Sequence, residues 1–300
     1  MKLTLYIVFQ LLLISTNAQI KTQSQIPNRI NEERFIHLNG IAQWITIKGD
    51  STKPLILFLH GGPGNPLSPF ADALYGKWEK DFTLVQWDQR GSGKTYGHSA
   101  PAELTPDYIH SHPLTVEQLT SDGIELARYL IQRFKQKKVI LFGTSWGSIL
   151  GVKMSLKNPE LFHAYVGHAQ IVYYSNGQKI AYKRVLEMAQ ENEDSVSLKV
   201  LSSIGLPPYD TARNTGLFNR VIQRYQRATS IPAPSSWFEL SPQYDNQKDN
   251  QNRLDGEDYS FVCFVGDKRL GIPSSGSAIN FFNDGLAFKI PIYLIQGEMD

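Results

Sequence analysis

Residues 139–147, VILFGTSWG, decide how this sequence is interpreted. The apolar run at 139–142 is typical of a buried strand, and a helical pattern continues from the second glycine towards Lys157. Between them lies Gly-x-Ser-x-Gly, which in this context places a serine on a sharp turn from strand to helix. The glycines permit a crowded turn, and the positive end of the helix favours an oxyanion beside it. Ser145 is therefore the predicted nucleophile, with a helix-capping serine as the alternative.

A second glycine motif, HGGPG at residues 60–64, lies upstream of the serine. It ends the run 54–60, whose lack of polar alternation predicts a strand buried on both faces. Enzymes with this serine turn take one oxyanion donor from such a loop and one from the residue after the nucleophile. The expected donors are the N–H groups of Trp146 and Gly62, with Gly61 as second choice for the loop. Taken alone, HGGPG is equally explained as a turn.

A third string, WDQRGSGKT at residues 87–95, follows another apolar run at 82–87. Together the three strings resemble the proline iminopeptidase family of α/β hydrolases, over residues 33–172. The resemblance implies an α/β-hydrolase fold, with a mostly parallel central sheet, flanking helices and an inserted, mainly helical cap. It also implies that Asp88 and Arg90 brace the oxyanion loop and do no chemistry themselves.

The same string is not a phosphate-binding loop, because no glycine stands five positions before Gly93. No cofactor is expected. The spacing of His110 and His112 would suit a metal, but no further ligand cluster accompanies them, so no metal site is expected either. The one cysteine, Cys263, excludes an intrachain disulfide framework and is predicted to be a packed core thiol.

The chain divides into four predicted segments: a signal peptide at 1–18, a first part of the hydrolase core at 19–172, a cap at 173–287 and a second part of the core at 288–300. Runs at 35–38 and 41–47, joined by Asn39-Gly40, predict an antiparallel edge hairpin. Thr115 with Gln118 predicts a capping box for a helix reaching about Gln136. Aromatic residues and interrupted helical patterns mark the cap, and a last apolar strand is expected at 290–296.

The first 18 residues have Lys2, an apolar run at 3–14 and small residues before a predicted cut after Ala18. This predicts a secreted or periplasmic protein. The run is shorter than the about 20 residues that a membrane span requires, so an uncleaved anchor is the less favoured alternative and no integral membrane association is expected. A formal net charge of +2 gives no electrostatic support for nucleic-acid binding. The oligomeric state is not indicated.

Asp300 stands where the fold implied by the resemblance places the acid of a catalytic triad, after the strand at 290–296. The histidine should follow the acid, but the sequence ends at Asp300. His168 is the nearest alternative among the earlier histidines, which are found at 37, 60, 98, 110, 112, 163 and 168. We therefore expect a chain truncated before the histidine, with the last strand and helix of the core missing.

The resemblance implies an aminopeptidase that releases an N-terminal residue, usually proline, through an acyl-enzyme on Ser145. It further implies cap carboxylates that pair with the free amino group of a small peptide. Glu239, in the segment 237–239, is the candidate, while Glu187, Glu191 and Glu257 are left unranked. The alternatives are an esterase or amidase of the same fold, and an inactive or binding protein that lacks the histidine.

Overall fold

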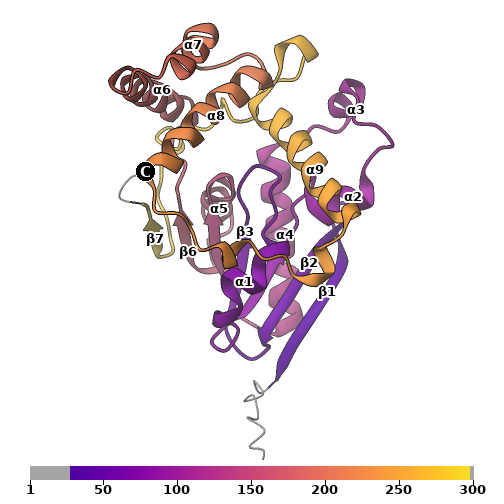
Figure 1. Cartoon of the computed structure of the whole chain (residues 1–300). Helices are drawn as coiled ribbons and strands as arrows, with labels where there is room; N and C mark the ends of the chain where they lie inside the picture. The colour runs from indigo at the N-terminus through magenta and orange to yellow at the C-terminus, as the bar shows by residue number, and fades with distance from the viewer. Residues whose placement is uncertain (1–27, 298–300) are drawn as a thin grey trace, which may run out of the picture.

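The computed structural model describes residues 28–297 of the chain. Its centre is a seven-stranded sheet in the order β1-β2-β4-β3-β5-β6-β7 (Figure 1). The strands span Arg29–Leu38 (β1), Ile41–Asp50 (β2), Leu55–Leu59 (β3), Thr83–Trp87 (β4), Val139–Thr144 (β5), Phe162–His168 (β6) and Ile292–Ile295 (β7). The predicted signal peptide and Asp300 lie outside the described residues.

The sheet is antiparallel at one edge and parallel elsewhere, as predicted. β1 and β2 form a hairpin with Leu38 opposite Ile41, and β2 pairs antiparallel with β4. All pairings from β4 through β7 are parallel. Asn39 and Gly40 both have positive φ, 42° and 87°, the conformation that suits the twist of a two-residue hairpin turn. Both hairpin strands extend further than predicted, β1 by six residues at its start.

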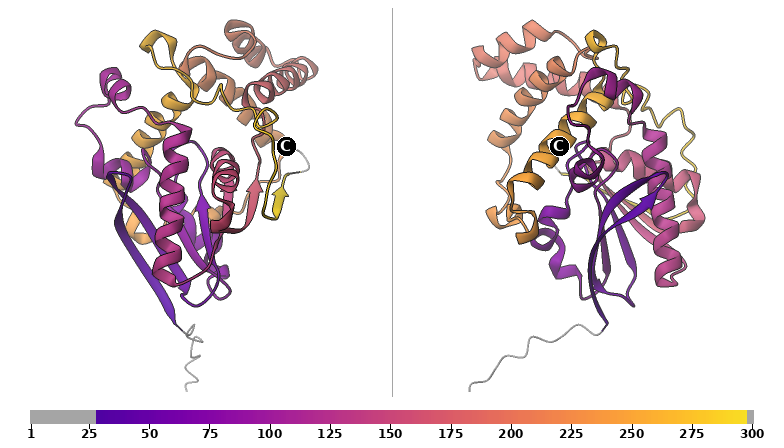
Figure 2. Two further views of the ribbon diagram at one scale, coloured as in Figure 1. Left: turned by 180° about the vertical axis from the view of Figure 1, so that it is seen from behind. Right: turned by 90° about the vertical axis from the view of Figure 1, so that its right-hand side faces the viewer.

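β3 and β4 are buried at every position, because helices cover them on both faces. On one face lie α4 (Val116–Phe134) and α5 (Trp146–Lys157), seen from behind in Figure 2. The predicted cap of α4 is present, since the Thr115 side chain accepts a hydrogen bond from the Gln118 N–H. The helix ends at Phe134, two residues before the predicted limit, where Lys135 adopts the left-handed conformation.

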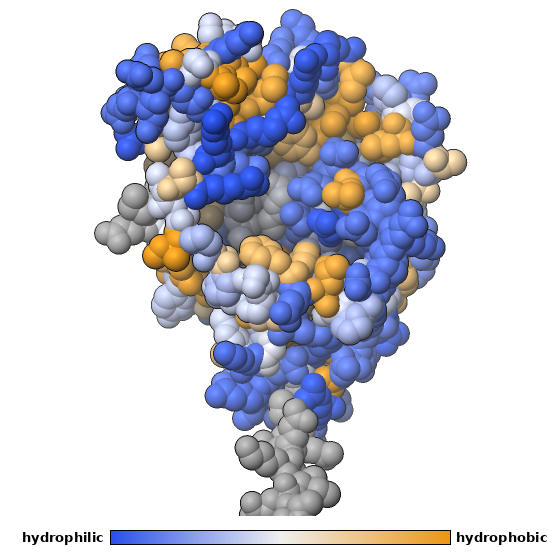
Figure 3. All heavy atoms as spheres, in the orientation of Figure 1, coloured by the Kyte–Doolittle hydropathy of each residue, from blue (hydrophilic) through white to orange (hydrophobic). Residues whose placement is uncertain are grey.

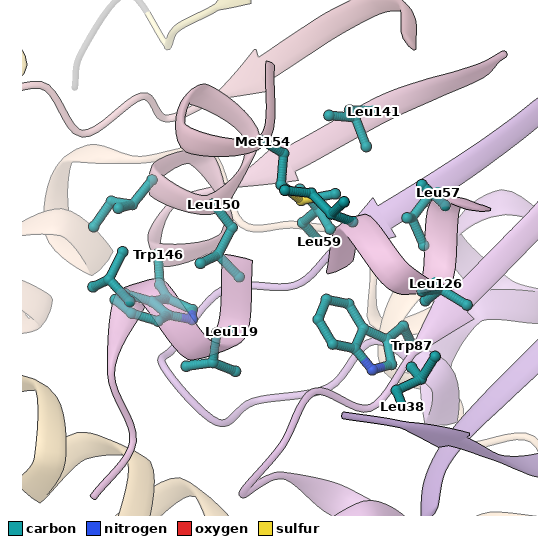
Figure 4. Packing of buried hydrophobic residues seen from close by; sticks show 14 of the residues in the cluster. Leu38, Leu57, Leu59, Trp87, Leu119, Leu126, Leu141, Trp146, Leu150 and Met154 are labelled. Atoms are coloured by element: carbon teal, nitrogen blue, oxygen red, sulfur yellow. The ribbon is translucent and has the colours of Figure 1, made fainter. Parts of the chain in front are cut away.

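The core under these helices is built from aliphatic side chains around two tryptophans. Figure 4 shows Leu126 beside Trp87, and Leu119 below Trp146. Both tryptophans are buried. Trp146 directly follows the predicted nucleophile, so the position of that turn is coupled to the packing of the core.

The opposite face of the sheet is covered by shorter elements. They include α1 (Ala71–Tyr75) and the short 3-10 turns at 68–70 and 76–78 on either side of it. α2 (Gly93–Ser99) contacts β2 and α9, and α3 (Pro106–Ser111) stands above the sheet in Figure 1. An aromatic group formed by Phe58, Tyr75, Trp78 and Phe142 packs on this face, with ring centroids 4.4–6.4 Å apart.

Four longer helices follow β6 within the segment predicted to form the cap. They are α6 (Tyr174–Glu191), α7 (Ser195–Ile204), α8 (Ala212–Thr229) and α9 (Gln247–Val265), and they extend above the carboxyl ends of the strands (Figure 1). α6, α7 and α8 enclose a small core of their own that includes Tyr182, Leu201 and Phe218. α9 instead joins the main core through Tyr259, Cys263 and Phe264. Cys263 is the buried thiol expected from the sequence.

Within residues 28–297, no helix is both long and apolar enough to cross a lipid bilayer. The same part of the chain holds no group of three or more His, Cys, Asp or Glu side chains arranged for a metal ion.

Candidate active site

Ser145 occupies a strained turn between β5 and α5. Its φ of 50° and ψ of −117° fall outside the regions that non-glycine residues normally adopt. The turn is held by the backbone, because the Ser145 N–H donates to the His168 carbonyl at 2.9 Å. The Ser148 N–H and hydroxyl both donate to the Ser145 carbonyl, at 2.9 and 2.6 Å. Such strain persists only where surrounding contacts enforce it, and it is typical of functional sites.

The two flanking glycines are required by close backbone approach. A Cβ on Gly147 would lie 1.9 Å from the Leu59 carbonyl oxygen, and one on Gly143 would lie 2.7 Å from the Gly147 oxygen. α5 therefore begins directly against the end of β3. This is the crowded turn that the Gly-x-Ser-x-Gly pattern predicts.

The HGGPG loop follows β3 and packs on the serine turn. An ideal Cβ on Gly61 would contact the Thr144 carbonyl oxygen at 3.2 Å and the Ser145 Cβ at 3.4 Å. Gly62 has a φ of 111°, which favours glycine, and lines the same cavity as Ser145 and Trp146. The structure thus brings together the predicted nucleophile and the segments that carry all three predicted oxyanion donors.

His60 is a structural member of this loop. It is buried, and desolvation lowers the pKa of its ring to about 4, so the imidazole is neutral at pH 7. Its Nδ1 lies 2.9 Å from the Gly61 carbonyl, and its Nε2 lies 3.2 Å from the Gln89 N–H. Nδ1 therefore carries the proton, and Nε2 accepts. These bonds leave no ring nitrogen free for proton transfer at Ser145.

The expected bracing role divides unevenly between Asp88 and Arg90. Asp88 is buried, accepts hydrogen bonds from the Ser68 hydroxyl and the Lys94 N–H, and so holds the chain just after the HGGPG loop. Arg90 instead pairs with Asp122 at 2.8 Å and donates to the Asn39 carbonyl. The prediction for Arg90 is wrong, because its guanidinium ties the hairpin turn to α4.

A cavity of about 530 Å³ opens beside Ser145, within the size range of small-molecule sites. Figure 3 shows the surface hollowed between the upper helices and the sheet. The described lining residues are Gly62, Pro63, Ser145, Trp146, Gln170, Ile171, Val172, Tyr173, Tyr174, Asn176, Gly177, Gln178, Ile180, Ala181, Phe218, Asn219, Ile222, Phe261, Phe264, Val265 and Phe282. None of these described side chains is acidic, basic or a histidine.

Comparison with known proteins agrees with this architecture. Residues 54–196 match the family model described as the alpha/beta hydrolase fold. The chain has the α/β-hydrolase fold and resembles proline iminopeptidases. The crystal structure of proline iminopeptidase from Mycobacterium smegmatis superimposes with a TM-score of 0.61 at 14% identity, covering 90% of this chain and 82% of that one. The VinJ crystal structure gives 0.60 at 18% identity, with the same coverage.

Among curated proteins, the probable aminopeptidase YbaC of Bacillus subtilis (strain 168) is 32% identical over 179 residues, which are 60% of this chain and 51% of that protein. A probable proline iminopeptidase of Leptolyngbya boryana is 35% identical over 111 residues, 36% of this chain and 28% of that protein. The chain thus spans about half the length, or less, of the curated relatives it matches.

The carboxylates considered for amine recognition lie in different places in the structure. Glu239 is exposed in a segment next to α1 and is not among the residues that line the cavity. Glu187 and Glu191 are exposed on α6. Glu257 is half-buried on α9, one helical turn before the cavity residue Phe261. The backbone at Glu257 packs closely on the HGGPG loop, because a Cβ on Gly64 would lie 2.8 Å from the Glu257 Cα.

Within residues 28–297, no hydrogen bond joins the Ser145 hydroxyl to a histidine. His168 contributes its backbone carbonyl to the serine turn, but its side chain is exposed and does not line the cavity. Asp300 lies outside the described residues, so its predicted role as the acid stays a prediction.

One residue of the site was missed from the sequence. Gln89 donates from Nε2 to the His60 carbonyl at 3.2 Å and accepts at Oε1 from the Trp146 indole N–H at 3.1 Å. The only sequence signal was its position between Asp88 and Arg90, since a glutamine after a buried strand has no pattern of its own.

Proposed function

We propose that this protein is a serine hydrolase that works through an acyl-enzyme on Ser145. The observation that carries the proposal is that Ser145 occupies a strained turn and lines one cavity together with Gly62 and Trp146. Ser145 Oγ attacks the substrate carbonyl carbon, and the resulting oxyanion is stabilised by the Trp146 and Gly62 N–H groups. The leaving group departs as the ester on Ser145 forms, and water then hydrolyses that ester to release a carboxylic acid.

Proton transfer requires a general base that accepts the Ser145 hydroxyl proton and passes it to the leaving group. We propose Asp300 as the acid that orients this base and stabilises its charged form. His60 is unsuited to the role, because both of its ring nitrogens are engaged in holding the loop.

The substrate proposed first is a small peptide with a free N-terminus, from which the enzyme releases the N-terminal residue, proline above all. The likeness to a probable aminopeptidase and to proline iminopeptidases supports this. A free ammonium group needs a carboxylate partner when it leaves water. Among the glutamates considered, Glu257 is the best placed, because its backbone packs on the HGGPG loop and Phe261, one helical turn later on α9, lines the cavity.

An esterase or amidase that takes an uncharged acyl group is the second candidate. The observation in its favour is the uncharged lining of the cavity over the described residues, with Phe218, Phe261 and Phe264 on its walls. An apolar acyl group would be desolvated there without needing a charged partner.

The two candidates are separated by a matched set of substrates: proline p-nitroanilide, its N-acetyl derivative and p-nitrophenyl acetate. Hydrolysis of the free-amine anilide alone would support the aminopeptidase, and the Glu257→Gln variant should then raise KM. Hydrolysis of the ester and of the acetylated anilide would support the second candidate. Ser145→Ala should abolish turnover and labelling by a fluorophosphonate in either case. Normal labelling of that variant would refute the mechanism, and absence of labelling in the wild type would favour an inactive protein.

Export is a separate proposal that rests on residues 1–18. N-terminal sequencing of the protein purified from outside the cell membrane should begin at Gln19. A mature protein that retains Met1 would overturn it.

A further inference from the structure

Gln89 occupies the point where the two halves of the proposed oxyanion hole meet. It follows β4 and is 1% exposed. Its side-chain amide lies between the His60 carbonyl, directly before Gly61, and the indole of Trp146, directly after the nucleophile. One buried amide therefore connects the loop after β3 with the turn after β5.

The orientation of this amide follows from its partners. An indole N–H only donates, and a carbonyl oxygen only accepts. The Gln89 Oε1 must face Trp146, and its Nε2 must face His60. Reversing the amide would set donor against donor and acceptor against acceptor, in a place that water does not reach.

The backbone of Gln89 is held by the same neighbours. Its N–H donates to His60 Nε2 at 3.2 Å, and its carbonyl accepts from the Ser92 hydroxyl at 2.7 Å. The His60 ring in turn donates from Nδ1 to the Gly61 carbonyl at 2.9 Å. Movement of Gln89 relative to the loop is thus opposed from both its backbone and its side chain.

Trp146 is the second fixed point. The residue is 3% exposed, and its ring packs edge-on against Phe264 of α9, with ring centroids 4.8 Å apart. The Gln89 hydrogen bond selects the rotation of the indole within that packing. The backbone N–H of Trp146, the proposed oxyanion donor, belongs to the same residue as this indole. The hydrogen bond from the indole to Gln89 therefore restrains the backbone donor as well as the ring.

We propose that Gln89 is a positioning residue that sets the spacing between the loop donor, at Gly62 or Gly61, and the Trp146 donor of the oxyanion hole. The proposal rests on the proposed serine hydrolase function. Gln89 does not touch the substrate, since it does not line the cavity beside Ser145. Its effect is on kcat, because an oxyanion forms only after the substrate has bound.

Gln89→Met is the variant that tests this, because methionine has nearly the same length and volume without the amide. The chain offers a matched control in Gln86→Met. Gln86 lies three residues earlier on β4, is 3% exposed, and its Nε2 has no hydrogen-bond partner in the described structure. Both variants exchange a buried glutamine for methionine, but only one removes the link between the loop and the turn.

With whichever of the three substrates the wild type hydrolyses, Gln89→Met should lower kcat by about 10- to 100-fold, with KM within about twofold. Gln86→Met should leave both within about twofold of the wild type. Hydrogen exchange followed by mass spectrometry should show faster exchange at residues 58–66 in Gln89→Met and not in Gln86→Met. Equal kcat in the two variants, or a loss that falls entirely on KM, would overturn the proposal.

Two further outcomes are decided by the same design. If Gln89→Met does not fold, Gln89→Asn keeps a polar amide but shortens its reach, and the same fall in kcat is expected. Wild-type-like kcat in Gln89→Asn would then count against the proposal. If the wild type neither turns over nor reacts with a fluorophosphonate, the proposed function fails, and hydrogen exchange at residues 58–66 still decides whether Gln89 holds the loop.

Discussion

Gly147→Ala is the substitution for which the structure predicts the largest local effect. The new Cβ would lie 1.9 Å from the Leu59 carbonyl oxygen and 2.6 Å from that of His60. A carbon and a carbonyl oxygen rarely approach closer than about 3.3 Å, so the start of α5 and the end of β3 must separate by roughly 1.4 Å. The Leu59 and His60 carbonyl oxygens belong to the backbone, so no change of side-chain rotamer can relieve the clash.

The expected cost is at least about 3 kcal/mol in the free energy of unfolding, the upper range for overpacking a close contact. The separation also shifts the Trp146 N–H relative to Gly61 and Gly62. A displacement of about 1 Å in such a site costs roughly 100-fold in rate. The rate of fluorophosphonate labelling of Ser145 should therefore fall together with stability.

Urea unfolding followed by circular dichroism measures the first effect, and Gly216→Ala is the control. Gly216 lies within α8, where a Cβ would have nothing within 4 Å. Alanine there should stabilise the protein by about 0.5–1 kcal/mol through helix propensity. If the free energy of unfolding of Gly147→Ala lies within about 1 kcal/mol of the wild-type value, and the fluorophosphonate labels Ser145 at the wild-type rate, the close approach of α5 to β3 is refuted.

Three further predictions concern buried polar groups. Arg90→Met should destabilise the protein by about 3 kcal/mol, because it leaves the fully buried Asp122 carboxylate without its cation, and urea unfolding would show this. Burial raises the pKa of Asp88 to about 7 in the folded state, so folding favours the protonated carboxyl group. The free energy of unfolding of the wild type, relative to that of Asp88→Asn, should therefore fall as the pH rises from about 4 to about 7. Urea unfolding of both proteins at pH 5 and pH 8 would test the sign of this change. Desolvation raises the pKa of the Cys263 thiol to about 11, so iodoacetamide at pH 7.5 should modify Cys263 only after unfolding, and modification of the native protein at the unfolded rate would contradict its burial.

The sequence by itself determined the sheet and the serine turn. Local chemistry is sufficient for these: the continuous apolar runs of β3, β4 and β5 require burial on both faces, and Asn39-Gly40 suits one type of turn. Gly143 and Gly147 indicated a crowded turn from the sequence alone, since only glycine tolerates the close approach of neighbouring backbone at these positions. The order of HGGPG and Gly-x-Ser-x-Gly was enough to predict that Gly62 and Trp146 meet beside Ser145.

Only the tertiary structure decided which polar side chains meet across that site. Gln89, His60 and Trp146 lie on three different segments, and their hydrogen bonds exist only because β3, β4 and β5 are neighbours in the sheet. Arg90 forms its salt bridge with Asp122 of α4. Glu239 lies in the segment beside α1 and does not line the cavity. Sequence patterns report periodicity and local backbone demands, whereas the partner of a polar side chain depends on which distant segments pack together.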